Sequence, residues 1–246
     1  MLNMYIAYCQ KLYIQHCHFL YILSLLITFG ANIYKYKDKI ILPLQPVLHY
    51  VTSDERVNKK HFKKSHILGI LNDETMMIEE VFGHYPPVYK ENMLPQFNFF
   101  SYTFDDDIFF VDFPVDSLIY AYKYPDKILH SFGFECKDIE RNYKSSHMLS
   151  DELYADMRQN GMNTEIVNFS DQGLLFRTYI SNMNNAESGM QIYDNTTFDL
   201  LADIKVPFSF KLLGHHNSYF YGVTMLPRET DNNTYVTFYK IKLTLS

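Results

Sequence analysis

The stretch FNFFSYTFDDDIFFVDF, residues 97–113, shows a pattern that recurs along this chain. Two runs rich in aromatic and β-branched residues, Phe97–Phe104 and Ile108–Phe113, flank three consecutive aspartates. Tyr, Phe, Val and Ile favour pleated strands, and a short acidic break between two such runs predicts a β-hairpin. The segment Ile108–Val111 is apolar on both faces, as expected for a strand packed between two layers.

The same pattern continues on both sides of this hairpin. Short apolar runs separated by turn residues predict further antiparallel pairs of strands. The paired runs are Ile33–Tyr36 with Lys39–Leu44, His66–Leu71 with Thr75–Phe82, Ser117–Tyr122 with Lys127–Phe134, Thr164–Phe169 with Leu174–Ile180, Met190–Tyr193 with Phe198–Val206, and Tyr219–Thr224 with Tyr235–Leu243. The last run alternates, with Tyr239 and Ile241 on one face and Lys240 and Lys242 on the other, which predicts an outer or edge strand.

Equivalent turns recur at a nearly constant spacing. Asp38 lies 69 residues before Asp107, and Asp107 lies 66 residues before Gly173. Each interval holds four strand candidates, and four-stranded units in tandem are typical of β-propeller blades. We therefore predict an all-β fold of blades with four antiparallel strands each, with about three and a half blades over residues 31–246.

One short helix is predicted as an insertion between two of these β units. Ser150 is a candidate N-cap, and Asp151 and Glu152 occupy the first turn. Gly161 stands at the position where the helix is expected to end.

Composition and charge narrow the possible functions. Of the 246 residues, 47% are hydrophobic and 17% are aromatic, and the formal net charge is −6. This composition is that of a globular protein, and it argues against a nucleic-acid partner, which would favour a strongly basic chain. The one basic cluster, in residues 56–64, is interpreted as a solvated loop.

Residues 1–30 form an atypical hydrophobic N-terminal segment. Its uncharged run His18–Gly30 has thirteen residues, fewer than the roughly 20 of a membrane span, so no clear transmembrane span is predicted. A bulky residue precedes both Cys9 and Cys17, which does not fit a lipoprotein signal. We interpret the segment as a buried strand or helix. Because the chain has no CxxC pair, the cysteines predict no zinc site, and a Cys9–Cys17 disulfide stays open.

Several segments resemble a known family through their order and spacing. They are Gly83–Tyr89 (GHYPPVY), Asp116–Tyr122 (DSLIYAY), Leu174–Arg177 (LLFR) and the closing course from Gln191 to Ile241. They resemble the C-terminal portion of Bacteroides-type, TolB-like six-bladed β-propeller lipoproteins, an uncharacterised family with a domain of unknown function. The resemblance implies a partial propeller in residues 31–246 and a location in the periplasm or at the outer-membrane surface. It implies no catalytic residue, because the family has no established activity.

Arg177 is the best candidate binding residue. It interrupts the apolar run Leu174–Ile180, in which alternation places Leu175, Arg177 and Tyr179 on one face. A guanidinium on a packed face must be paired or must face a cavity. The two alternatives are an ion pair with an Asp or Glu of the adjacent blade, and an opening into the central channel that would bind an anionic group.

His84, Tyr85 and Tyr89 are further candidate binding residues. Two prolines fix their loop, and a titratable His lies among aromatic residues; the alternative is the packing of a blade connector. The Asp105–Asp107 run and the His215–His216 pair are better interpreted as a solvated turn and a loop than as metal ligands. No metal site is therefore predicted, and no cofactor motif was found.

These patterns favour a non-catalytic β-propeller that binds a ligand or a protein partner, or serves as a scaffold, in a bacterial cell envelope. The chain would then be a fragment of a longer protein. The alternative is a propeller-type glycan hydrolase or lyase with its site at the central channel. Catalysis stays open, because the separation of carboxylates is not encoded in local sequence.

Overall fold

The structure is a computed structural model of the 246-residue chain. It describes residues 33–36, 39–44, 62–92, 94–105, 107–124, 127–145, 151–227 and 234–244. The chain divides into two units, residues 1–44 with 67–81 and residues 45–66 with 82–246. The predicted N-terminal segment with Cys9 and Cys17, the candidate cap Ser150 and residues 56–61 of the basic cluster lie outside the described residues.

The first unit is built on a four-stranded antiparallel sheet with the order β1-β2-β3-β4. Its strands are β1 (Tyr34–Tyr36), β2 (Lys39–Pro43), β3 (His66–Asn72) and β4 (Ile78–His84). The unit boundary falls within β4, so that residues 82–84 belong to the second unit. Residues 67–71 of β3 are all buried, because this strand has a neighbour on each side and apolar residues on both faces.

In its described residues, the second unit contains three further antiparallel sheets, each with its strands in chain order. The first sheet consists of β5 (Ser101–Asp105), β6 (Ile108–Asp112), β7 (Ile119–Lys123) and β8 (Lys127–Phe132). The second consists of β9 (Met162–Phe169), β10 (Leu174–Asn182), β11 (Glu187–Asp194) and β12 (Leu200–Val206). The third consists of β13 (Lys211–His216), β14 (Tyr219–Pro227) and β15 (Thr234–Ile241). None of these sheets closes on itself within the described residues.

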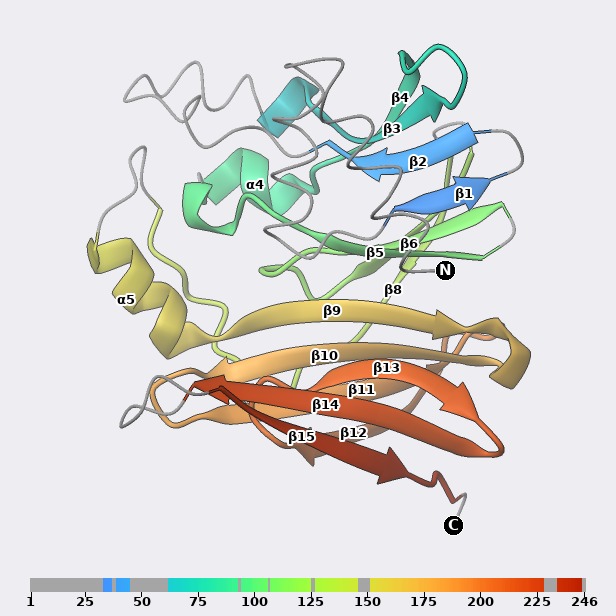
Figure 1. The fold of residues 1–246 in the computed structure, drawn as a ribbon. Coiled ribbons are helices and arrows are strands. Elements are labelled where there is room, and N and C mark those ends of the chain that lie inside the picture. Colours follow the sequence, from blue (N-terminus) through green and yellow to red (C-terminus); the bar gives the residue numbers. More distant parts are fainter. Residues whose placement is uncertain are drawn as a thin grey trace. The chain divides into compact units, whose positions relative to one another are not determined.

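Figure 1 shows the strands of these three sheets. Apolar side chains pack between the successive sheets of this unit. The layer between the first two sheets consists of Phe110, Ile119, Ala121 and Phe132 against Ile166, Leu175 and Tyr193. The layer between the last two consists of Phe176, Met190 and Ile192 against Phe210, Leu212 and Phe220. Consecutive residues of β10 therefore enter opposite layers, as the alternation in its sequence predicts.

The first two sheets also meet along the edge strands β5 and β9. The N–H of Ile166 donates to Oγ of Ser101 at 3.0 Å, and the N–H of Asn168 donates to Oγ1 of Thr103 at 3.3 Å. Alternate side chains of β5 thus accept hydrogen bonds from backbone N–H groups of the edge strand β9. Inside a sheet, a neighbouring strand would accept these hydrogen bonds. The two sheets lie side by side at this edge and remain separate.

The all-β prediction is confirmed, with antiparallel sheets of three or four strands. Asp107 and Gly173 each fall between the first and second strands of a four-stranded sheet, so their spacing marks a structural repeat. Asp38 lies outside the described residues, in the short sequence interval between β1 and β2. The interpretation of His215–His216 as a loop is wrong, because both residues belong to β13. The arrangement of the sheets as propeller blades stays a prediction.

Within the described residues, short helical elements and one longer helix connect the strands of the sheets. They include α4 (Pro87–Asn92), the 3₁₀ turns η2 (Pro95–Phe97) and η3 (Ser170–Gln172), and α5 (Asp151–Asn160), which is the helix predicted from the sequence. Two acidic residues in the first turn of α5 favour its N-terminus, and Gly161 follows its last residue. In the part of the chain that is described, no helix has the length and apolar character needed to cross a membrane.

Gly161 lies where α5 turns into β9. Its φ of +72° belongs to the left-handed region that favours glycine. A Cβ at this position would also overlap the backbone carbonyl oxygens of Ile180 and Ser181. Both the backbone conformation and the available space therefore require a glycine.

We expect Gly161→Ala to destabilise the protein by roughly 2 kcal/mol or more, because the left-handed conformation and the carbonyl overlap both cost free energy. The matched control is Gly214→Ala, since a Cβ at position 214 meets no atom within 4 Å. Urea unfolding followed by circular dichroism measures both variants. Equal stability of the two variants would contradict this account of the turn.

Candidate functional site

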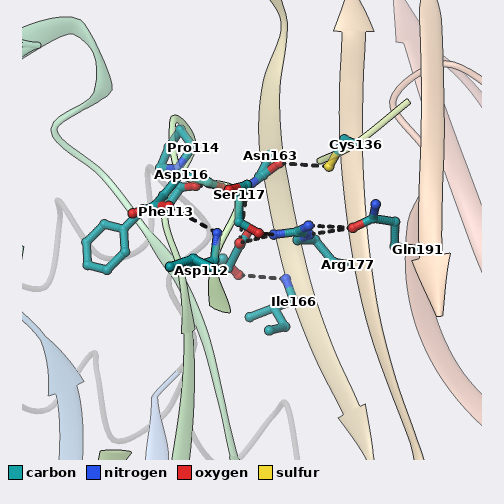
Figure 2. A network of polar contacts seen from close by, with 12 residues as sticks. Asp112, Phe113, Pro114, Asp116, Ser117, Cys136, Asn163, Ile166, Arg177 and Gln191 are labelled. Atoms are coloured by element: carbon teal, nitrogen blue, oxygen red, sulfur yellow. Dashed lines mark hydrogen bonds and ion pairs between the residues drawn. The ribbon is translucent and has the colours of Figure 1, made fainter. Parts of the chain in front are cut away.

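Arg177 lies on β10, and its side chain is completely buried in the layer between the first two sheets of the second unit. Figure 2 shows its guanidinium directed toward Asp112 on one side and Gln191 on the other. Nη1 lies 3.4 Å from Oδ1 of Asp112, and Nε donates to Oε1 of Gln191 at 3.0 Å. Asp112 ends β6 and Gln191 belongs to β11, so one side chain connects two sheets.

Backbone carbonyls supply the other main contacts of the guanidinium. Nη1 donates to the carbonyl oxygen of Ser117 at 2.8 Å, and Nη2 donates to that of Phe134 at 2.6 Å. Nη2 also donates to the hydroxyl of Tyr193 at 3.0 Å. Each of the five N–H groups of the guanidinium therefore has an acceptor, as a buried arginine requires.

Asp112 supplies the carboxyl group beside Arg177. Burial raises the pKa of Asp112 to about 7, against the lowering effect of Arg177 and Arg141. Burial by itself lowers the pKa of the Arg177 guanidinium, but Cys136 and Asp112 raise it above its ordinary value. This is the geometry of the first alternative, an ion pair with a carboxylate of the neighbouring sheet.

Asn163, at the start of β9, connects several segments of the same network. Its Nδ2 donates to Oδ1 of Asp112 at 3.1 Å and to the carbonyl oxygens of Phe113 at 2.9 Å and Asp116 at 2.8 Å. Its Oδ1 accepts from Sγ of Cys136 at 3.3 Å (Figure 2). This amide thus holds the turn after β6 against the segment that follows β8.

Gln191 extends the network away from Arg177. Its Nε2 donates to Oδ2 of Asp203 at 2.9 Å and to the carbonyl oxygen of Glu135 at 3.2 Å. Asp203, on β12, also accepts from the hydroxyl of Tyr179 at 2.6 Å. A continuous line of polar contacts therefore runs from β6 through β10 and β11 to β12.

His84, Tyr85 and Tyr89 lie in a second, mostly aromatic cluster. Tyr85 and Tyr89 are buried; their hydroxyls donate to Oδ1 of Asn98 at 2.6 Å and to the carbonyl oxygen of Phe97 at 2.8 Å. Burial raises the pKa of both tyrosines well above its ordinary value. Pro87 begins helix α4, which contains Tyr89, so part of the expected loop is helical.

His84 is half-buried at the edge of this cluster. Its ring lies 4.4 Å from the ring of His66, and its Nδ1 lies 3.3 Å from the carbonyl oxygen of Ser65. The cluster and the Arg177 network lie on two sides of residues 112–117, because the ring of Phe113 contacts Tyr85 and Tyr89 while its carbonyl accepts from Asn163. The structure brings the two groups near each other through this segment. The binding roles of these residues stay predictions.

The other polar candidates have ordinary partners. Asp105 accepts from Nδ2 of Asn168 at 3.0 Å, and Nδ1 of His215 lies 3.8 Å from Asp171. Across the described ranges, no group of three or more His, Cys, Asp and Glu side chains is placed to hold a metal ion.

Sequence reasoning did not identify Asp112, Asn163, Gln191 and Asp203 as members of the Arg177 network. Gln191 carries the same signal that singled out Arg177, a polar residue inside an otherwise apolar strand. Asp112 and Asn163 stand at strand ends, where polar residues are common and give no distinct signal.

Comparison with known proteins supports the fold. No family model matches this chain, and no curated protein matches it. Among solved structures, a member of the DUF4221 family from Bacteroides vulgatus is similar, with a TM-score of 0.60 and 12% sequence identity. The similarity covers 86% of this chain and 64% of that protein. The expected resemblance to a Bacteroides protein with a domain of unknown function is thus supported at the level of the fold.

We expect Arg177→Met to destabilise the protein by about 3–5 kcal/mol, because Asp112 and several carbonyl oxygens would lose a buried partner. Arg158→Met is the matched control, since Arg158 is exposed on α5 and its loss should change stability by less than about 0.5 kcal/mol. Urea unfolding of both variants and the wild type gives the comparison. A loss of the same small size in both variants would refute the structural role of Arg177.

The raised pKa of Asp112 predicts a dependence of stability on pH. Between the ordinary carboxyl value of 3.8 and about 7, the folded protein holds a proton that the unfolded chain has lost. The contribution of Asp112 to stability is therefore greatest at low pH and declines as the pH rises toward about 7. Asp112→Asn should flatten this decline in urea unfolding between pH 5 and pH 7.5. An identical pH profile in wild type and variant would show that Asp112 does not cause it.

Proposed function

We propose that this chain is a non-catalytic binding or scaffold protein of a bacterial cell envelope, built from blades of a six-bladed, TolB-like β-propeller. The 69- and 66-residue spacing and the four-stranded sheets in chain order support the blade arrangement. The sequence resemblance to envelope lipoproteins supports the location. The similar solved structure supports the fold on which both proposals rest.

One observation carries the choice of a binding function. The buried charges of the second unit, Arg177 and Asp112, contact each other and the backbone of neighbouring segments. These contacts connect two sheets. The two charged side chains therefore stabilise the packing of the sheets and the position of the segments that connect their strands. Rigid sheets that position variable loops are a common basis for recognition.

The alternative, a glycan hydrolase or lyase, is favoured by a different observation. A carboxyl group with a pKa of about 7, as at Asp112, is suited to general acid catalysis near neutral pH. Its side chain is only 2% exposed, so a substrate would reach it only after Arg177 and the surrounding turn had moved. We therefore rank this function second.

The test is a thermal melt of the full chain against neutral oligosaccharides, acidic oligosaccharides and peptides. A ligand at ten times its Kd should stabilise the protein by about 1.4 kcal/mol and raise its Tm by roughly 3–6 °C. Chromatography should recover the ligand intact. Fragments of a glycan that appear with the wild type and disappear with Asp112→Asn would favour the enzyme, and the absence of any Tm shift would count against the binding function.

A further inference from the structure

A cavity of about 170 Å³, lined by both polar and apolar surface, lies at the end of the Arg177 network. It is bounded by the segment that follows β8 and by β10, β11 and β12. Drug-sized ligands occupy pockets of roughly 300 Å³ or more, and a water molecule takes about 30 Å³ of the liquid. The cavity therefore suits one small molecule or the end group of a longer one.

The base of the cavity is fixed by contacts from several strands. Tyr179 lies opposite Gly189 on β11, where a Cβ would overlap its ring, so the glycine makes room for the tyrosine. The Tyr179 hydroxyl, Nε2 of Gln191 and the N–H of Lys137 all donate to the carboxylate of Asp203. Because Gln191 is itself held by Arg177, the buried network positions this carboxylate.

Asp203 retains acceptor capacity toward the cavity. A carboxylate offers about four acceptor positions, and the three donors named above are all neutral. Among the described residues, no Lys, Arg or His lies within ion-pair distance of Asp203. A hydroxyl group of a ligand could donate to the remaining position.

The rim of the cavity carries hydrogen-bond donors and acceptors on each of its two sides. Lys137 and Asp138 lie on the segment after β8, while Glu187 and Lys205 lie on β11 and β12. All four residues are exposed, and in the described part of the chain no ion pair engages them. With Asp203, the lining has two ammonium groups against three carboxylates, so neither side of the rim is uniformly positive or negative.

This arrangement favours a neutral ligand with many hydroxyl groups. An anion or a cation would approach a like charge on either side of the rim, which is unfavourable. A hydroxyl donates one hydrogen bond and accepts others, so it can contact carboxylates and ammonium groups together. Both the size of the cavity and its alternating polarity match a single sugar ring.

We propose that this cavity binds one ring of a neutral saccharide, with one hydroxyl donating to Asp203 and others contacting Lys205 and Glu187. This assignment deepens the proposed binding function and rests on it. It places recognition at the ends of β10, β11 and β12, away from the Arg177 guanidinium. Arg177 then acts as a positioning residue, through Gln191 and Asp203.

The experiment measures binding of glucose, galactose, mannose and N-acetylglucosamine to the full chain by calorimetry. Glucuronate and inorganic phosphate serve as anionic comparators, and glycine serves as a zwitterionic comparator that carries both charges. We expect at least one neutral sugar to bind more tightly than all three comparators. Lys205→Met and Glu187→Ala should each weaken that binding about tenfold, the effect of losing a hydrogen bond to a charged group. Lys123→Met is the control, because Lys123 is exposed on β7 and does not line the cavity.

Each failure has a separate meaning. If a neutral sugar binds and both rim variants bind it as tightly as the wild type, the cavity is not the site, although the binding function stands. If a charged comparator binds more tightly, or no sugar binds while a peptide does, the saccharide assignment is wrong and the binding function stands. If nothing binds here or in the wider ligand panel, both proposals fail.

Discussion

The guanidinium of Arg177 is buried where two sheets of the second unit meet, and its requirement for acceptors constrains the surrounding chain. Its partners come from the end of β6, the turn before β7, the segment after β8, and β11. Burying a guanidinium without acceptors costs far more free energy than its hydrogen bonds contribute when they form. The folded chain must therefore place acceptor groups of these segments around Arg177. The Arg177 side chain thereby holds in place the segment that leads from the first sheet of this unit toward α5.

The hydrogen bond between Arg177 and Gln191 also determines how the network ends at Asp203. Because Gln191 accepts from Arg177 with its oxygen, its amide nitrogen faces Glu135 and Asp203. Asp203 in turn accepts a hydrogen bond from the hydroxyl of Tyr179 and lines the cavity. A stabilising contact between sheets and a candidate binding surface are therefore parts of one hydrogen-bonded structure, in which the interior holds the surface group in place.

Local sequence patterns account for most of the elements and fail at identifiable places. The hairpins, the alternation of β10 and the end of α5 at Gly161 follow from period-two apolar patterns and turn residues. The sequence does not predict strand β13. Its pairing register with β14 shifts between Leu212 and Gly214, and this shift breaks the alternation of apolar and polar residues that identifies a strand. The two prolines before Tyr89 predict a loop, although Pro87 is well suited to the first position of α4.

The sequence by itself determined that this chain is an all-β repeat and that Arg177, inside an apolar strand, needs a partner. Only the tertiary structure decided which partner, because Asp112 lies 65 residues away in sequence and Phe134 lies 43 residues away. The cavity gave no signal in the sequence, since lysines and acids at strand ends and in connecting segments are ordinary in solvated positions. These residues come together only because the sheet of β9–β12 packs against the segment after β8. The periodicity of a local stretch of sequence carries no information about contacts between such distant residues.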